Sequence, residues 1–349
     1  MTSRTLHLAV IGAGLIGRAH GVRALVNDRV GALTYVDPLL TEDMELPDEL
    51  AGARRAGSLA EIAASVDGVI VATPNATHAD IAVEAIAGGI PTLVEKPLAS
   101  TEEDTLRIVR AADDSGVPVL VGHHRRHSGT LPAARAVDES GELGQLVAVS
   151  GSAEFSKPSW YFDEAPWRRE PGGGPLLINL VHDLEALRHL AGEISRLRCV
   201  GSSAARGFPV EDTAALILEF ASGALGTFLL SDAASSYRSW EQTSGENLSY
   251  DRATDEDCYH LAGRAGSLAL PTMRRSRAEG EASWWSAARR DTVDIERIDP
   301  LTAQIDHFLD VIVGDAQPLV SARDGLQSLR LAASAAADGA PVEVAAPPA

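Results

Sequence analysis

A lysine at the end of a short apolar run is the first residue that could do chemistry. The chain has only two lysines, Lys96 and Lys157, whereas it has 28 arginines. An arginine stays charged in any protein environment, but a partly desolvated lysine can lose its proton and so serve in proton transfer. Lys96 follows the strand-like residues 93–95 and precedes Pro97. We interpret Lys96 as a candidate catalytic residue; the alternative is a solvated charge at a strand end.

Asn179 and His182 form the second candidate group. Residues 175–190 read as one helix, in which a separation of three puts both side chains on one face. His182 could accept the proton of a hydroxyl group, because the ordinary histidine pKa lies near neutral pH. Lys96 would bond the same oxygen, and Asn179 would orient the substrate. The alternative for His182 is a packing role.

The first part of the chain has a pattern that could hold the reaction's cofactor. Residues 6–11 are almost wholly apolar, as expected of a strand buried on both faces of a parallel sheet. A G-x-G-x-x-G sequence and a helix-compatible stretch follow at once. This order is the dinucleotide-binding fingerprint, in which the glycines allow a tight turn, close approach of a pyrophosphate and close helix packing. The predicted contacts in the loop are Gly12, Gly14, Leu15, Ile16 and Gly17.

An acidic residue in the right place favours NAD over NADP. The strand predicted over residues 32–36 ends in Asp37, about 20 residues beyond the glycine loop. Asp37 could accept hydrogen bonds from the ribose hydroxyls and would repel a 2′-phosphate. The next dozen residues contain no lysine or arginine that could hold that phosphate. A solvated aspartate is the alternative reading.

Further candidates follow later strands, at the edge where a parallel sheet binds ligands. The predicted cofactor contacts there are Thr73, Pro74, Asn75, His78, Glu95 and Lys96. For the segment at Pro74 and Asn75, capping of the next helix is the alternative. Residues 122–127, GHHRRH, supply His123 and Arg126 as predicted substrate contacts. Structural packing is the alternative there, and the adjacent arginines oppose a metal site, so we predict no metal.

Aromatic residues gather before a glycine cluster at residues 172–174. Trp160, Trp167 and Arg168 are predicted to contact substrate, because flat rings beside a cation suit the faces and hydroxyls of a sugar. Core packing would explain some of the aromatic residues of this segment equally well.

Composition limits the class of partner and compartment. The formal net charge of −19 argues against a nucleic acid or an anionic membrane as partner. Two cysteines are too few for a disulfide framework, which favours a cytoplasmic location. No apolar stretch approaches the roughly 20 residues that span a bilayer. A small, weakly charged ligand fits these properties best.

Four motifs in order, GAGLIG, ATPNATH, VEKP and VGHHRR, make the chain resemble the glucose-fructose oxidoreductase and inositol dehydrogenase (Gfo/Idh/MocA) family. The likeness extends through residues 167–168, 172–183 and 304–323. It implies an α/β protein with an N-terminal Rossmann dinucleotide-binding domain, residues 1–125. Residues 126–349 would form a C-terminal α+β domain with a large open mixed, mainly antiparallel sheet. The resemblance also implies NAD or NADP, sugar or cyclitol substrates, and homodimers or homotetramers formed through that sheet.

One position departs from the family pattern. Many members carry an aspartate four residues before the histidine, where this chain has Ile178. Asn179 lies one position later and cannot take a proton, and Asp183 is turned about 100° away from His182 on a helix.

The second half has strand-like runs at residues 146–150, 214–220 and 224–230, separated by glycine-bearing turns, which suits antiparallel pairing. Such an apolar sheet must be covered on both faces, by helices or by another subunit. The leading hypothesis is an NAD-dependent dehydrogenase that acts on a secondary hydroxyl of a sugar, cyclitol or glycoside. The alternatives are a lyase or epimerase that keeps its cofactor and oxidises transiently, and a non-catalytic sensor of the same fold.

Overall fold

The computed structural model describes residues 4–40, 48–337 and 342–343. Contacts divide the chain into two compact units. Unit 1 consists of residues 1–127 and 300–327, and unit 2 of residues 128–299 and 328–349. In the described part of the chain, no helix is long and apolar enough to cross a membrane.

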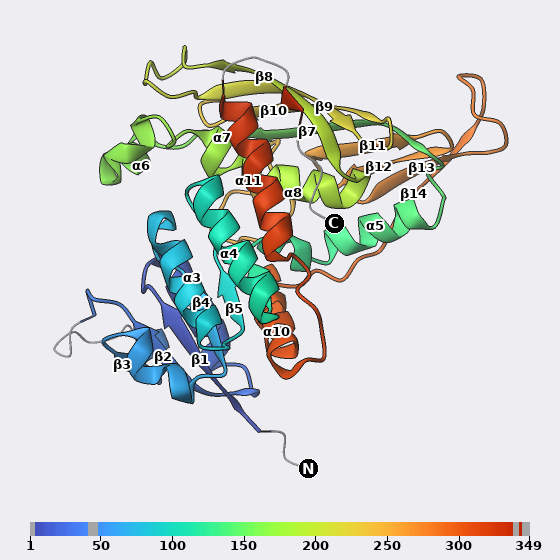
Figure 1. Cartoon of the computed structure of the whole chain (residues 1–349). Helices are drawn as coiled ribbons and strands as arrows, with labels where there is room; N and C mark the ends of the chain where they lie inside the picture. The colour runs from blue at the N-terminus through green and yellow to red at the C-terminus, as the bar shows by residue number, and fades with distance from the viewer. Residues whose placement is uncertain (1–3, 41–47, 338–341, 344–349) are drawn as a thin grey trace. The chain divides into compact units, whose positions relative to one another are not determined.

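Unit 1 is built on a parallel six-stranded sheet with the strand order β3-β2-β1-β4-β5-β6 (Figure 1). The order reverses between β1 and β4, as in a doubly wound sheet, and the ligand crevice of such a sheet lies at this reversal. The strands are β1 (Leu6–Ile11), β2 (Val30–Val36), β3 (Arg54–Ala56), β4 (Gly68–Val71), β5 (Thr92–Val94) and β6 (Val119–Val121).

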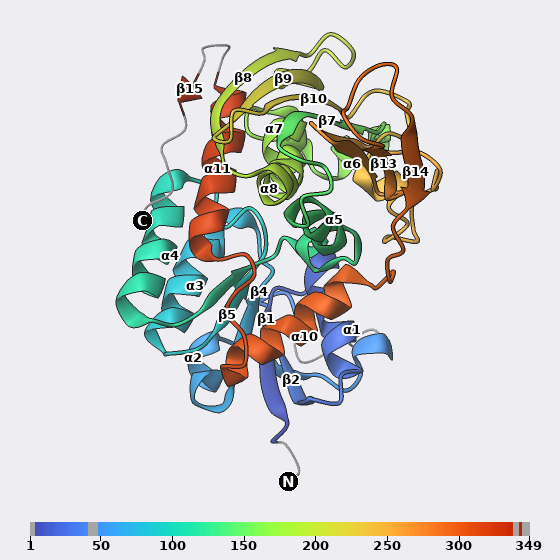
Figure 2. The same cartoon turned by 90° about the vertical axis from the view of Figure 1, so that its right-hand side faces the viewer.

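Helices cover both faces of this sheet, as the uninterrupted apolar strands predict. Helices α3 and α4 lie on one side of β1, and α1 and α10 lie on the other (Figure 2). Alternate residues of β1 serve the two cores: Ala9 and Ile11 pack with α3 and α4, whereas Leu8 and Val10 pack with α1 and α10. The helices are α1 (Leu15–Leu25), α2 (Leu59–Ile62), α3 (His78–Ala87), α4 (Glu102–Ser115) and α10 (Pro300–Val313). Short 3-10 helices are η1 (Asp48–Leu50), η2 (Ala63–Ser65), η3 (Asn75–Thr77) and η4 (His124–His127).

Helix α10 belongs to unit 1, although the sequence-based division assigned the whole of residues 126–349 to the second domain. Ile305, Phe308 and Leu309 of α10 are fully buried in the core beside β1. A Cβ on Gly68 of β4 would lie 2.4 Å from Ile312, so the glycine lets α10 approach the sheet. The predicted domain boundary is wrong for α10 because this helix supplies one of the layers that cover the sheet of unit 1. Helix α11 (Ala322–Ala336) then runs from unit 1 into unit 2 at residue 328.

Unit 2 contains a nine-stranded mixed sheet in the order β14-β13-β12-β11-β7-β10-β9-β8-β15. Only β7 and β10 pair in parallel, and every other neighbouring pair is antiparallel. The predicted mixed, mainly antiparallel sheet is therefore confirmed. The strands are β7 (Leu146–Glu154), β8 (Ile194–Ser202), β9 (Thr213–Phe220), β10 (Leu225–Ser231), β11 (Tyr259–Gly263), β12 (Gly266–Leu270), β13 (Arg274–Ala278), β14 (Ala288–Thr292) and β15 (Val342–Glu343).

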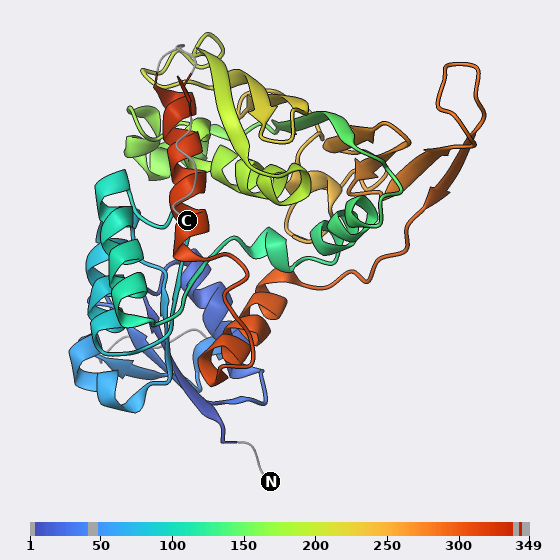
Figure 3. The same ribbon diagram turned by 45° about the vertical axis from the view of Figure 1, so that its right-hand side comes forward.

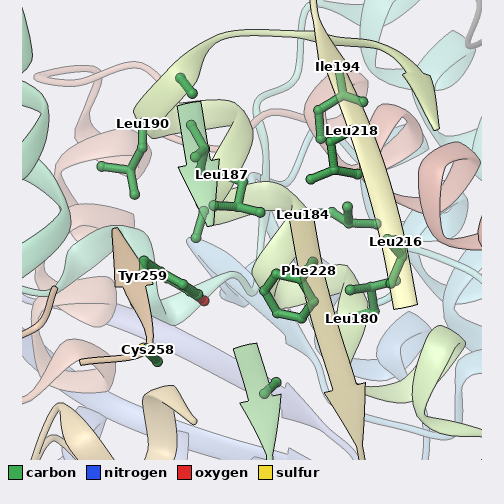
Figure 4. Close-up of a cluster of buried hydrophobic side chains, with 14 of the residues drawn as sticks. Leu180, Leu184, Leu187, Leu190, Ile194, Leu216, Leu218, Phe228, Cys258 and Tyr259 are labelled. Atoms are coloured by element: carbon green, nitrogen blue, oxygen red, sulfur yellow. The ribbon is translucent and has the colours of Figure 1, made fainter. Parts of the chain in front are cut away.

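One face of the unit 2 sheet packs against α8 (Leu180–Ala191). Leu180, Leu184 and Leu187 recur at helical spacing and point toward Leu216 of β9 and Phe228 of β10 (Figure 4). The other helices of the unit are α5 (Thr130–Glu139), α6 (Ser159–Glu164), α7 (Pro175–Ile178) and α9 (Trp240–Thr243), with the 3-10 helix η5 (Pro166–Arg169).

The opposite face of the sheet carries exposed apolar side chains. Residues of β9 and β10 alternate between buried and exposed, and the exposed set includes Ile217, Leu225 and Leu229, with Val200 of β8 75% exposed. We call these four residues the open face. Strands β13 and β14 form a hairpin (Figure 3), and its connecting loop carries Trp284 and Trp285, which are 90% and 87% exposed. Of the C-terminal tail at residues 340–349, which is rich in proline and alanine, the structure describes only residues 342–343.

Candidate active site

The glycine loop between β1 and α1 has the geometry that a dinucleotide requires. Gly12 has a φ of +99°, and a Cβ there would lie 2.6 Å from the carbonyl oxygen of Ala72. A Cβ on Gly17 would lie 2.0 Å from the oxygen of Gly12, so this glycine permits the close packing of α1. Around Gly14, apart from its chain neighbours, no atom of the described residues lies within 4 Å of the Cβ position. The first and third glycines thus shape the loop, and the second leaves space for a ligand.

The N-terminus of α1 faces this open space. Gly14 is the N-cap residue, and within the described ranges no side chain caps the helix. Leu15 in the first turn is 92% exposed, and Ile16 is half-buried. Uncapped N–H groups and the helix dipole favour an anionic group at this point. The residues therefore fit the pyrophosphate of a dinucleotide.

Asp37 lies beside the glycine loop. Its two carboxylate oxygens accept hydrogen bonds from the backbone N–H groups of Ala13, at 2.7 Å, and Leu39, at 2.8 Å. Each oxygen keeps a further lone pair that could accept from a hydroxyl group. Arg18, which the sequence interpretation did not consider, donates from Nε to the oxygen of Ala13 at 2.8 Å. A cation therefore lies at the loop, but its guanidinium is directed to the backbone of the loop.

The predicted residues after β4 divide into an exposed and a buried set. Pro74 and Asn75 are exposed and Thr73 is half-buried, so the loop is accessible to a ligand. His78 is fully buried, and its ring nitrogens lie 2.9 Å from the oxygen of Thr73 and 3.1 Å from the oxygen of Pro97. The ring thus fastens this loop to the segment that follows Lys96.

Lys96 is held by a buried pair directly after β5. The side chain of Glu95 lies 2.7 Å from Nε2 of His20 and also accepts from the backbone N–H of Lys96. Burial raises the pKa of Glu95, but the hydrogen bond and charge of His20, with Lys96, outweigh it, so this pKa lies below its usual value. Lys96 itself is half-buried. Glu95 therefore supports the position of Lys96.

The histidines after β6 have different environments. His123 and His127 are buried, whereas Arg126 is half-buried. His127 packs on His307 of α10 with ring centroids 5.1 Å apart, and burial with nearby cations lowers the pKa of His127 to about 3. It is a neutral packing residue. No three His, Cys, Asp or Glu residues gather as a metal site among the described residues, and the absence of a metal stays a prediction.

In unit 2 the predicted helix over residues 175–190 is interrupted. α7 ends at Ile178 and α8 begins at Leu180, so Asn179 lies at the junction. The N–H of His182 donates to the oxygen of Asn179 at 3.0 Å, which keeps both residues in one turn. His182 is only 7% exposed. Asp183 points into the core and accepts a hydrogen bond from Tyr259, in line with its expected direction away from His182.

A third polar residue lies beside Asn179. Lys157 is 8% exposed, and its Nζ lies 2.7 Å from Oδ1 of Asn179 and 3.4 Å from a carboxylate oxygen of Asp232. Burial lowers the pKa of Lys157 to about 8, with Arg168 and Arg206 adding to the shift and Asp232 opposing it. The sequence analysis noted Lys157 as rare but gave it no role. The signal that could have found it was the rarity of lysine in this chain.

The aromatic segment is partly exposed. Trp160 and Trp167 are 59% and 54% exposed. The guanidinium of Arg168 lies 3.7 Å from the ring centroid of Tyr161, and its Nη1 donates to the oxygen of Tyr161 at 2.6 Å. Phe162 is buried. The two indole rings thus remain exposed at this surface, whereas the guanidinium of Arg168 is held against Tyr161.

The candidate residues form two groups. Those of unit 1 follow the carboxyl ends of neighbouring parallel strands, where the glycine loop, Asp37, the loop at Thr73 and Lys96 lie together. In unit 2, Asn179 and His182 lie at the junction of α7 and α8, with Lys157 beside Asn179.

Comparisons with known proteins agree with this architecture. A family model described as "Oxidoreductase family, NAD-binding Rossmann fold" matches residues 6–123, and one described as "GFO/IDH/MocA C-terminal domain" matches residues 132–269. The rhizopine catabolism protein MocA of Rhizobium meliloti is 29% identical over 229 residues, which are 63% of this chain and 69% of that protein. An inositol 2-dehydrogenase of Burkholderia lata is 32% identical over 197 residues, 54% of this chain and 55% of that protein.

Similarity to a solved structure covers almost the whole chain. A levoglucosan dehydrogenase in complex with NADH and levoglucosan superposes with a TM-score of 0.75 at 20% identity, over 98% of this chain and 100% of that one. At this identity the likeness concerns the fold. The two family models, together with the open glycine loop and the two-unit architecture, lead to one conclusion: the chain belongs to the Gfo/Idh/MocA family of NAD(P)-binding oxidoreductases.

Proposed function

We propose that the protein is an NAD-dependent dehydrogenase that oxidises a secondary hydroxyl of a sugar, cyclitol or glycoside to a ketone. The observation that carries the proposal is the open space at Gly14, at the uncapped start of α1, beside the carboxylate of Asp37. A bound NAD would supply the acceptor for the hydride. The names of the relatives, which include dehydrogenases of inositol and levoglucosan, support a polyhydroxylated substrate.

The preference for NAD over NADP rests on Asp37. Two backbone N–H groups hold its carboxylate beside the glycine loop, where the adenosine ribose of a dinucleotide binds in this fold. A carboxylate accepts hydrogen bonds from ribose hydroxyls and repels a 2′-phosphate. The Nε of Arg18 is engaged by the backbone oxygen of Ala13, at 2.8 Å.

Three side chains carry the proposed proton chemistry. As the hydride leaves the carbinol carbon, the hydroxyl proton must leave its oxygen, and His182 is the proposed acceptor. Lys96 would hydrogen-bond the same oxygen and share the proton, and Asn179 would orient the substrate. The half-buried position of Lys96, with Glu95 fixed behind it, supports this role. Trp160, Trp167 and Arg168 would contact the rings and hydroxyls of the substrate.

The experiment is a screen of purified protein with NAD against sugars, cyclitols and glycosides, followed by NADH absorbance and by product analysis. The proposal expects NADH to form in proportion to ketone. A changed substrate without net NADH would instead identify the lyase or epimerase with transient oxidation. Ligand binding without any turnover would identify a sensor.

We also propose that the open face of the unit 2 sheet is the contact between subunits. The opposite face is covered by α8, whereas Val200 and Leu225 are 75% and 58% exposed on the open one. Apolar side chains gathered on one sheet face are typical of a protein contact. A homodimer or homotetramer would cover them.

A further inference from the structure

Lys157 is fixed more firmly than a surface lysine. Its backbone N–H donates to the oxygen of Asp232 at 2.8 Å, and its own backbone oxygen accepts from Nη2 of Arg206 at 2.9 Å. Its Nζ lies 4.9 Å from the ring centroid of Tyr161. The ammonium therefore occupies one position, and its nearest polar neighbour is the side chain of Asn179.

This contact decides which way the amide of Asn179 faces. An ammonium has three hydrogen-bond donors and no acceptor, so the atom 2.7 Å from it must be the amide oxygen. The NH2 group of Asn179 then points away from Lys157. Asn179 is only half-buried, and within unit 2 as described its amide nitrogen has no hydrogen-bond partner. The two donors of the amide are thus available to a ligand.

We propose that Lys157 is a positioning residue that fixes the amide of Asn179 with its NH2 group toward the substrate, so that Asn179 acts only as a hydrogen-bond donor. This inference rests on the proposed function, in which Asn179 orients the substrate. It names the chemistry of the substrate atom at this point: a ketone, ether, carboxylate or hydroxyl oxygen that accepts. It also gives the second of the chain's two lysines a role beside the proposed reaction.

The charges around Lys157 change what a carboxylate at position 179 would do. Asp232 lies 3.4 Å from Nζ of Lys157 and also accepts from Nε of Arg206 at 2.9 Å, and the guanidinium of Arg168 lies over the ring of Tyr161. Glu211 is a further charge close enough to interact with Lys157. In Asn179→Asp the new carboxylate would meet the ammonium directly. We therefore expect it to form an ion pair with Lys157 and to raise the pKa of Lys157, before it acts on His182.

A double-mutant cycle tests whether Lys157 acts through Asn179. The variants are Lys157→Met, Asn179→Ala and the double variant, with kcat and KM measured on a substrate from the screen. Lys157→Met should lower kcat/KM about 10-fold, as expected for a lost hydrogen bond to a charged group. In the Asn179→Ala background, Lys157→Met should lower kcat/KM by less than about 2-fold. If the loss of kcat/KM in the double variant equals the product of the losses in the two single variants, the proposal is overturned, because Lys157 then acts independently of Asn179.

A conservative variant separates positioning from general support of the fold. Lys157→Gln keeps a donor that can reach toward the oxygen of Asn179, so it should recover part of the activity that Lys157→Met loses. Both variants remove the charge equally. If they are equally impaired, the hydrogen bond is not the source of the effect and the proposal fails. Thermal unfolding and NADH binding of each variant check that it is folded.

The second test needs neither turnover nor a variant of Lys157. The chain has four asparagines, so carbon-detected spectra of protein with labelled asparagine contain few side-chain amide signals. The Asn179 signal, assigned by its loss in Asn179→Ala, should shift with a midpoint near pH 8 as Lys157 loses its proton. A signal that does not change between pH 6.5 and 9.5 overturns the proposal. A shifting signal in a protein without dehydrogenase activity would instead refute the proposed function alone.

Discussion

Lys157→Met should abolish a pH dependence of stability in the alkaline range. In the folded protein, burial lowers the pKa of Lys157 to about 8, whereas the ordinary lysine pKa is 10.5. Between these two values the unfolded chain binds more protons than the folded one. The free energy of unfolding therefore rises with pH in this window. Below pH 8 both states are protonated, and the folded protein bears the full cost of a buried ammonium.

The size of the effect follows from the two pKa values. The interval from about 8 to 10.5, at about 1.4 kcal/mol per pH unit, corresponds to about 3 kcal/mol. Solvent screening reduces this only slightly, because Lys157 is 8% exposed. The wild type should thus gain about 3 kcal/mol of stability between pH 8 and 10.5 relative to a variant that does not titrate there.

The assay is urea unfolding followed by tryptophan fluorescence at pH 7 to 10.5. All five tryptophans lie in unit 2, so the signal reports the unit that contains Lys157. Lys157→Arg is the matched control, because its guanidinium stays charged at every pH used and Lys157→Met stays neutral. Both should lack the rise that the wild type shows. If wild type and Lys157→Met change in parallel from pH 8 to 10.5, Lys157 titrates normally and its assigned burial is refuted.

Four further tests address the other parts of the site and the subunit contact. Lys96→Arg should impair turnover nearly as much as Lys96→Ala, with NADH binding retained in both, and near-normal turnover of the arginine variant would leave only an electrostatic role. His182→Ala should lower kcat by about 10² to 10⁴, as the loss of a proton acceptor does, and a smaller loss in stopped-flow and steady-state rates would exclude it as the base. Asp37→Ser should shift the ratio of NADH to NADPH dissociation constants by about 10-fold or more toward NADPH, and an unchanged fluorescence titration would show that Asp37 does not face the ribose. Ile217→Asp with Leu229→Asp should lower the mass measured by light scattering, and an unchanged oligomer would remove the open face as the contact.

Much of the fold was predictable because its signals are local. The apolar run at residues 6–11 and the glycine loop after it have the expected strand and turn, since a strand buried on both faces must be apolar throughout and the loop needs glycine at positions 12 and 17. The C-cap of α4 at Gly116, in the left-handed region with a φ of 71°, is a local signal of the same kind. In unit 2 the strand-like runs and glycine-bearing turns predicted antiparallel pairing, whereas the large mixed sheet was implied by the family resemblance.

The sequence could not show relations between distant residues. Nothing near Lys157 in sequence indicates that Asp232 and Asn179 surround it, because those contacts depend on how β7, β10 and α8 meet. The assignment of α10 to unit 1 was missed for the same reason. The break at Asn179 was missed because α7 and α8 have a continuous helical pattern, and no glycine or proline marks position 179.

The packing of α10 on the parallel sheet also has a consequence for how this chain is made. When residues 1–127 have left the ribosome, all six strands of unit 1 are present, but Ile305, Phe308 and Leu309 are not yet synthesised. One face of the nascent sheet, with Leu8 and Val10, is then covered by α1 alone while about 180 further residues are synthesised. At the usual 5–20 residues per second this interval lasts on the order of ten seconds or more. A chain truncated after residue 127 would lack α10 altogether, so the dinucleotide-binding unit needs residues from both the first and the last part of the chain.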